Sequence, residues 1–210
     1  MIITWFGHSC FLIQNSLGQK ILMDPYDECL GGDPYKGSAD IITISHNHFD
    51  HNCTDLVTPG AIIINTPCVY EMPSVKIQGI PCYHDNVKGA KRGENIIYII
   101  EIDELRFCHL GDLGHMLSDK EIDLIGSLDV LFIPVGGNFT IESETAAKLC
   151  NKLQSKLVIP MHYKIPSMNF PIHGMEKFIA FMKNAMNLKS NTLVIDEPLS
   201  GINNVKIFEL

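Results

Sequence analysis

A histidine-rich segment that directly follows an apolar stretch constrains this chain more than any other feature. Residues 45–51 read S-H-N-H-F-D-H, so three histidines and one aspartate stand within six positions. Residues 39–44 before them are mostly apolar and predict a short buried strand. A loop at a strand end can turn several side chains toward one point, whereas a continued strand would alternate them between its two faces. We therefore predict a loop whose polar side chains converge.

The side chains of this loop are of the types that bind divalent metals. Neutral imidazole nitrogens and carboxylate oxygens are ligands of zinc, iron and manganese, and catalytic sites use few protein ligands so that water can take an open position. The alternative is a solvated polar loop that happens to be rich in histidine. Because short histidine-rich tracts are typical of metal binding, the sequence favours a metal site that includes His46, His48, Asp50 and His51.

Length and charge disfavour several classes of function. With 210 residues, 46% hydrophobic and 19% charged, the chain can fold as one domain, residues 1–210, around a substantial core. The net charge of −8 and the lack of a lysine–arginine cluster disfavour nucleic acid as a partner. The first residues lack a basic segment followed by a long apolar stretch, and about 18 apolar residues run together nowhere in the sequence. We therefore expect a cytoplasmic protein without a membrane span.

The cysteines also indicate a reducing compartment. Seven cysteines, an odd number, are scattered along the chain without a C-x-x-C pair. Free cysteine behaves as a small residue that is often buried. We therefore expect reduced thiols. Cys53 and Cys82 lie near candidate ligands in the sequence, and we interpret both as core or loop residues.

Periodicity and turn residues predict a chain of short strands with few helices. An apolar face formed by Ala146, Leu149, Cys150 and Leu153 indicates a helix over residues 140–154, capped by Thr140. Apolar residues likewise indicate a helix over 175–186, and Asn52 or Thr54 is expected to cap a helix that runs to residue 57. Strands are expected over residues 2–6, 10–14, 19–23, 39–44, 61–65, 75–83, 95–102, 105–109, 129–134, 157–160, 192–195 and 205–208.

Further histidines and aspartates lie at or near the ends of these expected strands. A lone histidine after a strand is more often structural than a ligand, and Asp24, which precedes Pro25, is also a good turn residue. Lys164 is either a binder of substrate anions or simply solvated. Residue types alone leave these alternatives open. The candidates are His8, Asp24, His84, His109, Asp112, His115 and His162.

Five motifs in a fixed order give the chain a resemblance to a known family. They are G-H-S-C-F-L-I at 7–13, M-D-P at 23–25, H-x-H-x-D-H at 46–51, G-D at 111–112 and P-M-H-Y at 160–163. The chain resembles the metallo-β-lactamase superfamily, especially the branch similar to L-ascorbate-6-phosphate lactonase. This resemblance implies an α/β (α+β) fold, a four-layer αββα sandwich of two mixed sheets with the site at one edge. Leu113 stands where that branch often carries threonine, so the substrate is not implied.

The resemblance also implies a ligand set for two divalent ions, Zn²⁺ first, with Mn²⁺ or Fe²⁺ as alternatives. His46, His48 and His84 would hold the first ion. Asp50, His51 and His162 would hold the second, and Asp112 would be shared. Asp24 would brace the histidine loop. We place His109 and His115 outside the ligand set, although the sequence leaves open that either replaces His84. Asp50 or the hydroxide held by the two ions would shuttle a proton to the leaving group, and His8 would orient the substrate or donate a hydrogen bond.

These implied features favour a hydrolase over other functions. Two ions lower the pKa of a water molecule and neutralise charge on the attacked centre, so we expect a dinuclear hydrolase of a small ester, lactone or phosphodiester. The alternatives are a diiron oxidoreductase with the same ligands and a metal-binding module without catalysis. A nuclease would need a basic surface or RNA-binding arm. A small-molecule substrate is the expected partner, and a homo-oligomer remains open.

Overall fold

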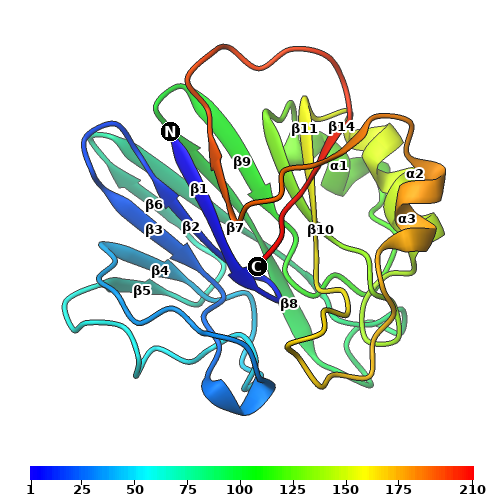
Figure 1. Ribbon diagram of the computed structural model, residues 1–210, viewed down its shortest axis with the longest axis horizontal. Coiled ribbons are helices and arrows are strands. Elements are labelled where there is room, and N and C mark those ends of the chain that lie inside the picture. Colours follow the sequence, from blue (N-terminus) through cyan, green and yellow to red (C-terminus); the bar gives the residue numbers. More distant parts are fainter.

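Two β-sheets face each other in the computed structural model, which describes residues 1–210 (Figure 1). Strands β1, β2, β3 and β13 of the first sheet pair antiparallel, whereas β3, β4 and β5 pair parallel. The order across this six-stranded sheet is β13 (Thr192–Val194), β1 (Ile2–Gly7), β2 (Cys10–Gln14), β3 (Lys20–Met23), β4 (Ile41–Thr43) and β5 (Ile62–Ile64).

The second sheet has eight strands and changes direction in its middle. Strands β6 to β9 form an antiparallel meander, and β9, β10, β11, β14 and β12 are parallel. Strand β8 is buried along most of its length, as expected for its continuous apolar run. The order is β12 (Ala185–Asn187), β14 (Asn204–Ile207), β11 (Leu157–Met161), β10 (Val130–Pro134), β9 (Leu105–His109), β8 (Glu94–Ile102), β7 (Val75–Tyr83) and β6 (Val69–Met72).

The hydrophobic core joins the two sheets. The ring of Phe11 on β2 lies 4.6 Å from the ring of Phe132 on β10, and both side chains are fully buried. The Tyr98 hydroxyl on β8 reaches across to the carbonyls of Ile44 and Ile64, at 3.0 and 2.9 Å, just after β4 and at the end of β5. This hydroxyl satisfies backbone acceptors at the base of the histidine loop, so the loop starts from a fixed point.

Helices are unevenly distributed around the two sheets. The helices α1 (Asp119–Ile125), α2 (Ser143–Leu153) and α3 (Glu176–Phe181) all follow β9, and Figure 1 shows them beside β10, β11 and β14. Between β3 and β8 the chain has only the short 3-10 helix η1 (Glu28–Leu30). There, loop side chains such as Tyr26, Leu30 and Tyr35 are buried, and Tyr35 packs edge-on against Phe6 of β1 at 4.9 Å. Loops therefore replace helices around the first sheet.

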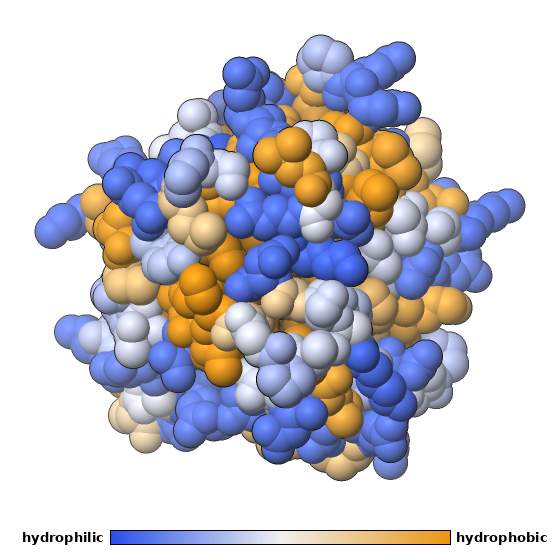
Figure 2. Space-filling view, turned by 90° about the vertical axis from the view of Figure 1, so that its left-hand side faces the viewer, coloured by the Kyte–Doolittle hydropathy of each residue, from blue (hydrophilic) through white to orange (hydrophobic).

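The strands β5 and β6 are sheet edges with exposed apolar side chains. Ile62, Ile63 and Val69 are 43%, 48% and 61% exposed. Both strands lie at the left in Figure 1, and Figure 2 shows that face, with apolar patches between hydrophilic areas. None of the helices combines the length and the apolar character that crossing a membrane requires.

The helix expected over residues 52–57 is absent, so Asp50 and His51 do not precede a helix. The segment forms turns instead, because its backbone donors bond to the loop over residues 25–38: the amide of Cys53 donates to Pro25 O (2.8 Å) and that of Thr58 to Gly37 O (3.0 Å). Proline at 59 also disfavours helical geometry at the residue before it.

Two other helix expectations were wrong in their extent. Helix α2 begins at Ser143, and Thr140 does not cap it, because the Ile141 amide donates to Leu113 O (2.9 Å) and keeps the chain outside the helix past Thr140. Helix α3 ends at Phe181 rather than at residue 186. The chain then turns into β12, which pairs with β14 in the register Ala185 to Val205.

Candidate metal centre

Six segments deliver polar side chains to the same edge of the two sheets. His8 directly follows β1, Asp24 follows β3, and His84 follows β7. The loop over 45–51 follows β4, Asp112 comes three residues after β9, and His162 directly follows β11. Apart from Asp24, residues of these segments form groups whose donor atoms lie within 4.8 Å of one another. The groups are His46, His48 and His84; His8, Asp50, His51 and His162; and His46, His51 and Asp112.

Asp112 lies between the groups. Its carboxylate oxygens lie 3.3 Å from Nε2 of His51, 3.2 Å from Nε2 of His84 and 3.1 Å from Nε2 of His162. Burial alone would raise the pKa of Asp112, but the imidazoles of His162 and His51 hold it well below its usual value. An ionised carboxylate therefore faces imidazoles from both predicted ligand sets.

Asp24 braces the histidine loop from behind. Its Oδ1 accepts a hydrogen bond from the Ser45 amide (2.7 Å), and its Oδ2 accepts from the Ser45 hydroxyl (2.6 Å) and from His51 Nδ1 (2.8 Å). Burial lowers the pKa of His51, but the carboxylates of Asp112 and Asp24 outweigh burial and raise it. This geometry favours the bracing role over the alternative of a turn residue.

The same network sets the ring orientation of His46. The Ser45 hydroxyl has one proton and donates it to Asp24, so at 2.9 Å from His46 Nδ1 it can only accept. His46 therefore carries its proton on Nδ1 and presents a bare Nε2, and burial lowers its pKa to about 3. The Nε2 atoms of His46, His51 and His162 are buried without a hydrogen-bond partner. Orphaned nitrogens of this kind fit a metal ion.

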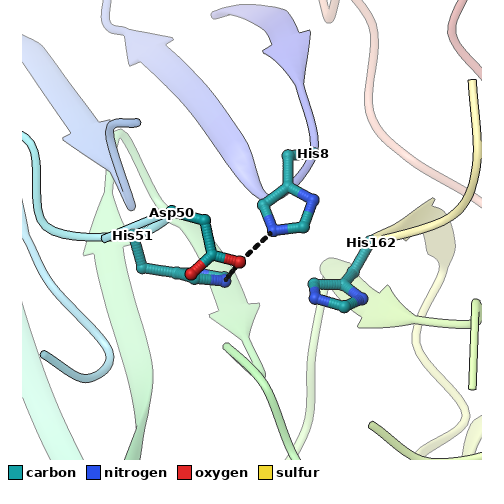
Figure 3. A group of neighbouring side chains, drawn as sticks. All are labelled: His8, Asp50, His51 and His162. Carbon is teal, nitrogen blue, oxygen red and sulfur yellow. Dashed lines mark hydrogen bonds and ion pairs between the residues drawn. The ribbon is translucent and has the colours of Figure 1, made fainter. Parts of the chain in front are cut away.

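The contact between His8 and Asp50 is the shortest one between side chains of the second group, and Figure 3 shows it. His8 Nε2 lies 3.1 Å from Asp50 Oδ2, and both side chains are almost fully buried. Burial lowers the pKa of His8 to about 4. Burial would raise the pKa of Asp50, but the hydrogen bond from His8 and the charge of His51 lower it. Asp50 therefore stays ionised near neutral pH.

Three residues of this site have backbone angles that side-chain-bearing residues rarely adopt. The φ angles of His8, Asp24 and His162 are 51°, 45° and 50°. Left-handed backbone at residues other than glycine costs about 1–3 kcal/mol and is concentrated at functional sites. These three positions therefore carry strain that the surrounding structure must hold in place.

His109 and His115 lie outside all three groups. His109 is fully buried, but both of its ring nitrogens are used by the backbone: Nδ1 accepts from the Gly111 amide (3.2 Å), and Nε2 donates to Ser9 O (3.0 Å). His115 is half-buried beside Tyr83, whose amide donates to His115 Nε2 at 3.3 Å. Their hydrogen bonds explain both residues without a metal.

Asn95 is a residue that the sequence analysis missed. Its Oδ1 accepts from the Asp112 amide (2.9 Å), and its Nδ2 donates to Leu110 O (2.9 Å). Gly111, with φ of +53°, passes so close that an added Cβ would lie 2.4 Å from Asn95 Oδ1. Asn95, at the start of β8, thus positions the G-D motif through hydrogen bonds. No pattern of neighbouring residues in the sequence predicts this contact.

A cavity of about 770 Å³ opens beside this centre. His46 and His48 border it, and Arg92 and Glu94 line it too. Three of its 17 lining residues are hydrophobic, so its wall suits a polar molecule. Lys164 is exposed and does not line this cavity.

Phe170, from the loop that follows β11, closes another side of the centre. Its ring lies 5.4 Å from that of His8 and 6.0 Å from that of His162. It also lies 5.3 Å from Phe139, whose ring is 5.4 Å from the Arg92 guanidinium carbon. An aromatic wall thus stands beside the second group, while the cavity adjoins the first.

Two facing mixed sheets with a histidine–aspartate centre at their shared edge define a class of metal-binding fold. The family model described as "Beta-lactamase superfamily domain" matches residues 2–162, and the chain belongs to this superfamily. A UPF0173 metal-dependent hydrolase from Thermococcus onnurineus is 30% identical over 190 residues, covering 77% of this chain and 84% of that protein. The predicted superfamily is confirmed; the lactonase-like branch is not.

Solved structures agree with this assignment. A proposed Zn-dependent hydrolase of the metallo-β-lactamase superfamily from Thermotoga maritima has a TM-score of 0.83 and 33% identity, covering 99% of this chain and 97% of that chain. CmlA, a diiron β-hydroxylase from Streptomyces venezuelae, has a TM-score of 0.56 and 15% identity, covering 77% of this chain and 44% of that chain. The likeness to CmlA is one of fold alone. The predicted metallo-β-lactamase fold is confirmed.

Proposed function

We propose that this protein is a metal-dependent hydrolase that uses two divalent ions, Zn²⁺ first, against a small ester, lactone or phosphodiester. One observation carries the proposal: imidazoles from both predicted ligand sets point at the single carboxylate of Asp112, at 3.1 to 3.3 Å. The relatives named as metal-dependent hydrolases support the reaction class.

The residues would be divided between the two ions as follows. His46, His48 and His84 would hold the first ion, Asp50, His51 and His162 the second, and Asp112 both. Buried nitrogens without partners and an ionised carboxylate between them fit this assignment. When bound, two such ions lower the pKa of a water molecule to about 7 and neutralise charge on the attacked centre.

The chain's own residues have three tasks in this reaction. Asp24 and Ser45 hold the rings of His51 and His46 through Nδ1, which leaves Nε2 of each ring available to an ion. Asp50, which stays ionised, can accept a proton and pass it to the leaving group. Phe170 covers His8 and His162 and limits the access of bulk water to them.

The substrate would enter from the polar cavity beside His46 and His48. This cavity is large enough for a small molecule. Its polar wall favours a substrate that carries hydroxyl, amide or charged groups. The aromatic wall at Phe139 and Phe170 adjoins the cavity through Arg92, which lies over the Phe139 ring, and it would meet the departing part of the substrate.

Metal analysis and a substrate panel test this proposal. Protein purified without added metal should contain about two ions per chain. We expect hydrolysis of bis-p-nitrophenyl phosphate or of members of a lactone panel, abolished by a chelator and restored by Zn²⁺, Mn²⁺ or Fe²⁺. Reproducible binding of no ion would overturn the proposal.

Variants test the ligand assignment directly. His84→Ala should lose one ion, whereas His109→Ala should keep both, because His109 bonds only to backbone atoms. His115→Ala is a second control with a half-buried side chain. The opposite result for His84 and His109 would reverse the assignment.

A diiron oxidoreductase is the second candidate, favoured only by the fold shared with CmlA. Anaerobic addition of two Fe²⁺ per chain followed by exposure to oxygen separates the two candidates. An oxygen-dependent absorption change with product formation would favour the oxidoreductase, and metal-dependent hydrolysis would favour the hydrolase. Two bound ions with neither activity would indicate a metal-binding module without catalysis.

We also propose a cytoplasmic location and a small-molecule partner rather than nucleic acid. All seven cysteines are free thiols, which suits a reducing compartment, and the net charge of −8 opposes binding to nucleic acid.

We further propose that the chain forms a homo-oligomer through the exposed apolar edges at β5 and β6. Light scattering at several concentrations tests it, and a single species with the mass of one chain would exclude it.

A further inference from the structure

The second group of the metal centre contains a histidine that the resemblance does not assign to the metal. His8, Asp50, His51 and His162 each bring one donor atom, and these four atoms lie within 4.8 Å of one another (Figure 3). All four residues are buried, with at most 4% of their surface exposed. The first group differs, because His48 is exposed.

The main chain fixes where the His8 ring points. The His8 carbonyl accepts hydrogen bonds from the Trp5 indole (3.1 Å) and from the His162 amide (3.2 Å). The His8 backbone is left-handed, with φ of 51°, and its ring centroid lies 4.3 Å from that of His162. The two histidines are therefore tied to each other through the backbone, and both face the same space.

His8 approaches Asp50 from the side on which the other imidazoles lie, where a ligand of the same ion would stand. Asp24 differs, because it supports His51 through Nδ1, on the side of the ring away from the centre. His8 Nε2 instead lies 3.1 Å from Oδ2, the same oxygen that lies 3.6 Å from His51 Nε2. With Asp112 counted, five protein groups would surround this ion, and neighbouring ligands at about 2.0–2.1 Å would stand roughly 3.0 to 3.6 Å apart. Both separations lie in that range.

We propose that His8 Nε2 is a ligand of the second ion, alongside Asp50, His51 and His162. This inference rests on the proposed function only in requiring that two ions bind. With four buried donors of its own, the second site holds its ion more tightly than the site of His46, His48 and His84. A chelator therefore removes the first ion before the second.

Two substitutions separate coordination from hydrogen bonding. His8→Gln retains an amide that can donate to Asp50 but is a poor zinc ligand, and His8→Phe keeps a ring without donors. If His8 is a ligand, both variants bind the second ion at least about 100-fold more weakly, beyond the usual effect of residues that only support a ligand. Competition with a chromophoric chelator measures this affinity without any activity assay.

Cobalt absorption tests the order of filling. The first equivalent of Co²⁺ should bind to the second site, so His8→Gln should change the visible spectrum recorded after the first equivalent. His48→Gln should change only the spectrum recorded after the second equivalent, which binds to the first site. His115→Asn, outside the centre, should match the wild type in both, and circular dichroism before metal addition checks that each variant is folded.

The outcomes distinguish this inference from the proposed function. Wild-type affinity for two ions in both His8 variants overturns the inference and leaves the hydrolase proposal intact. Wild-type affinity in His8→Gln with a loss in His8→Phe also overturns it, because His8 would then only hydrogen-bond to Asp50. Failure of the wild type to bind any ion would instead defeat the proposed function.

Discussion

The two halves of the candidate metal centre come from the same loop but differ in their exposure to solvent. His46 and His48 border the polar cavity, and His48 is exposed. Asp50 and His51, only a few positions later, lie buried against His8, His162 and the aromatic wall. The turn between them thus divides the loop into a side that meets solvent and a side enclosed by the fold. We therefore propose that the first half meets the substrate and that the second half holds its metal ion more firmly.

The two halves are also braced by different chemistry. His51 donates directly to the carboxylate of Asp24, whereas His46 donates to the hydroxyl of Ser45, which in turn donates to Asp24. A hydrogen bond to a charged acceptor is roughly twice as strong as one between neutral groups. The enclosed half therefore has the stronger support, and variants along this network can separate the halves.

Removing the shared carboxylate of Asp112 should abolish metal binding in both halves of the centre. Asp112→Ala takes away the group that faces imidazoles of both halves, and it leaves several buried imidazoles without their counter-charge. We expect loss of both ions and a fall in hydrolysis of about 10³-fold or more. Metal content and initial rates measure the effect. Retention of one ion at full affinity would show that Asp112 belongs to one half only.

Asp24→Asn should weaken the enclosed half more than the open half. The amide cannot accept from both Ser45 and His51 at Oδ2, so His51 loses its support. We expect the second ion to bind about 10- to 100-fold more weakly, with a smaller change for the first. Chelator competition gives both values. Asp55→Asn, an exposed change just past the same loop, is the matched control, and an equal loss at both sites would contradict the comparison.

Asn95→Ala should affect both halves alike, because it acts through the shared aspartate. The substitution leaves the Asp112 amide and the Leu110 carbonyl buried without partners. We expect the free energy of unfolding to fall by about 2 kcal/mol, with both ions weakened about 10-fold. Urea unfolding of metal-free protein measures the first quantity. Asn184→Ala, at an exposed asparagine, serves as the reference, and a loss confined to one ion would disprove this role.

Ser45→Ala should give the smallest change and restrict it to the open half. His46 loses its acceptor at Nδ1, while His51 keeps Asp24. We expect the first ion to bind about 10-fold more weakly or less, and the second to be unchanged. The cobalt titration that separates the two equivalents measures this. A larger effect on the second ion would mean that Ser45 acts mainly through Asp24.

The sequence was sufficient to predict most strands, because apolar runs such as that of β8 indicate buried strands directly. It was insufficient to predict segments whose backbone groups form hydrogen bonds with residues far away in the sequence. Residues 52–57 bond to the loop at 25–38 instead of coiling, and residues after Phe181 pair with β14. Helix α1 was also missed, although Ser118 and Glu121 form a capping box that the pattern S-x-x-E would have revealed.

The residues of the candidate centre could be predicted from the sequence on different grounds. His46, His48, Asp50 and His51 follow from their own spacing, whereas His84, Asp112 and His162 came only from the resemblance to a family. The structure brings all seven together. The hydrogen bonds of Asn95 to Asp112 and of His8 to Asp50 span 17 and 42 positions, so no local pattern encodes them. Such contacts become visible only when the sheets are assembled.

The left-handed backbone at His8, Asp24 and His162 has a consequence for anyone who improves this protein in the laboratory. Glycine adopts such angles without steric cost, so glycine at these three positions would relieve the local backbone strain. A screen that rewards heat resistance alone would thus tend to accept glycine at His8 and His162, whereas at Asp24 the loss of three buried hydrogen bonds would outweigh the relief of strain. Selection schemes for robust variants should therefore score metal retention together with melting temperature.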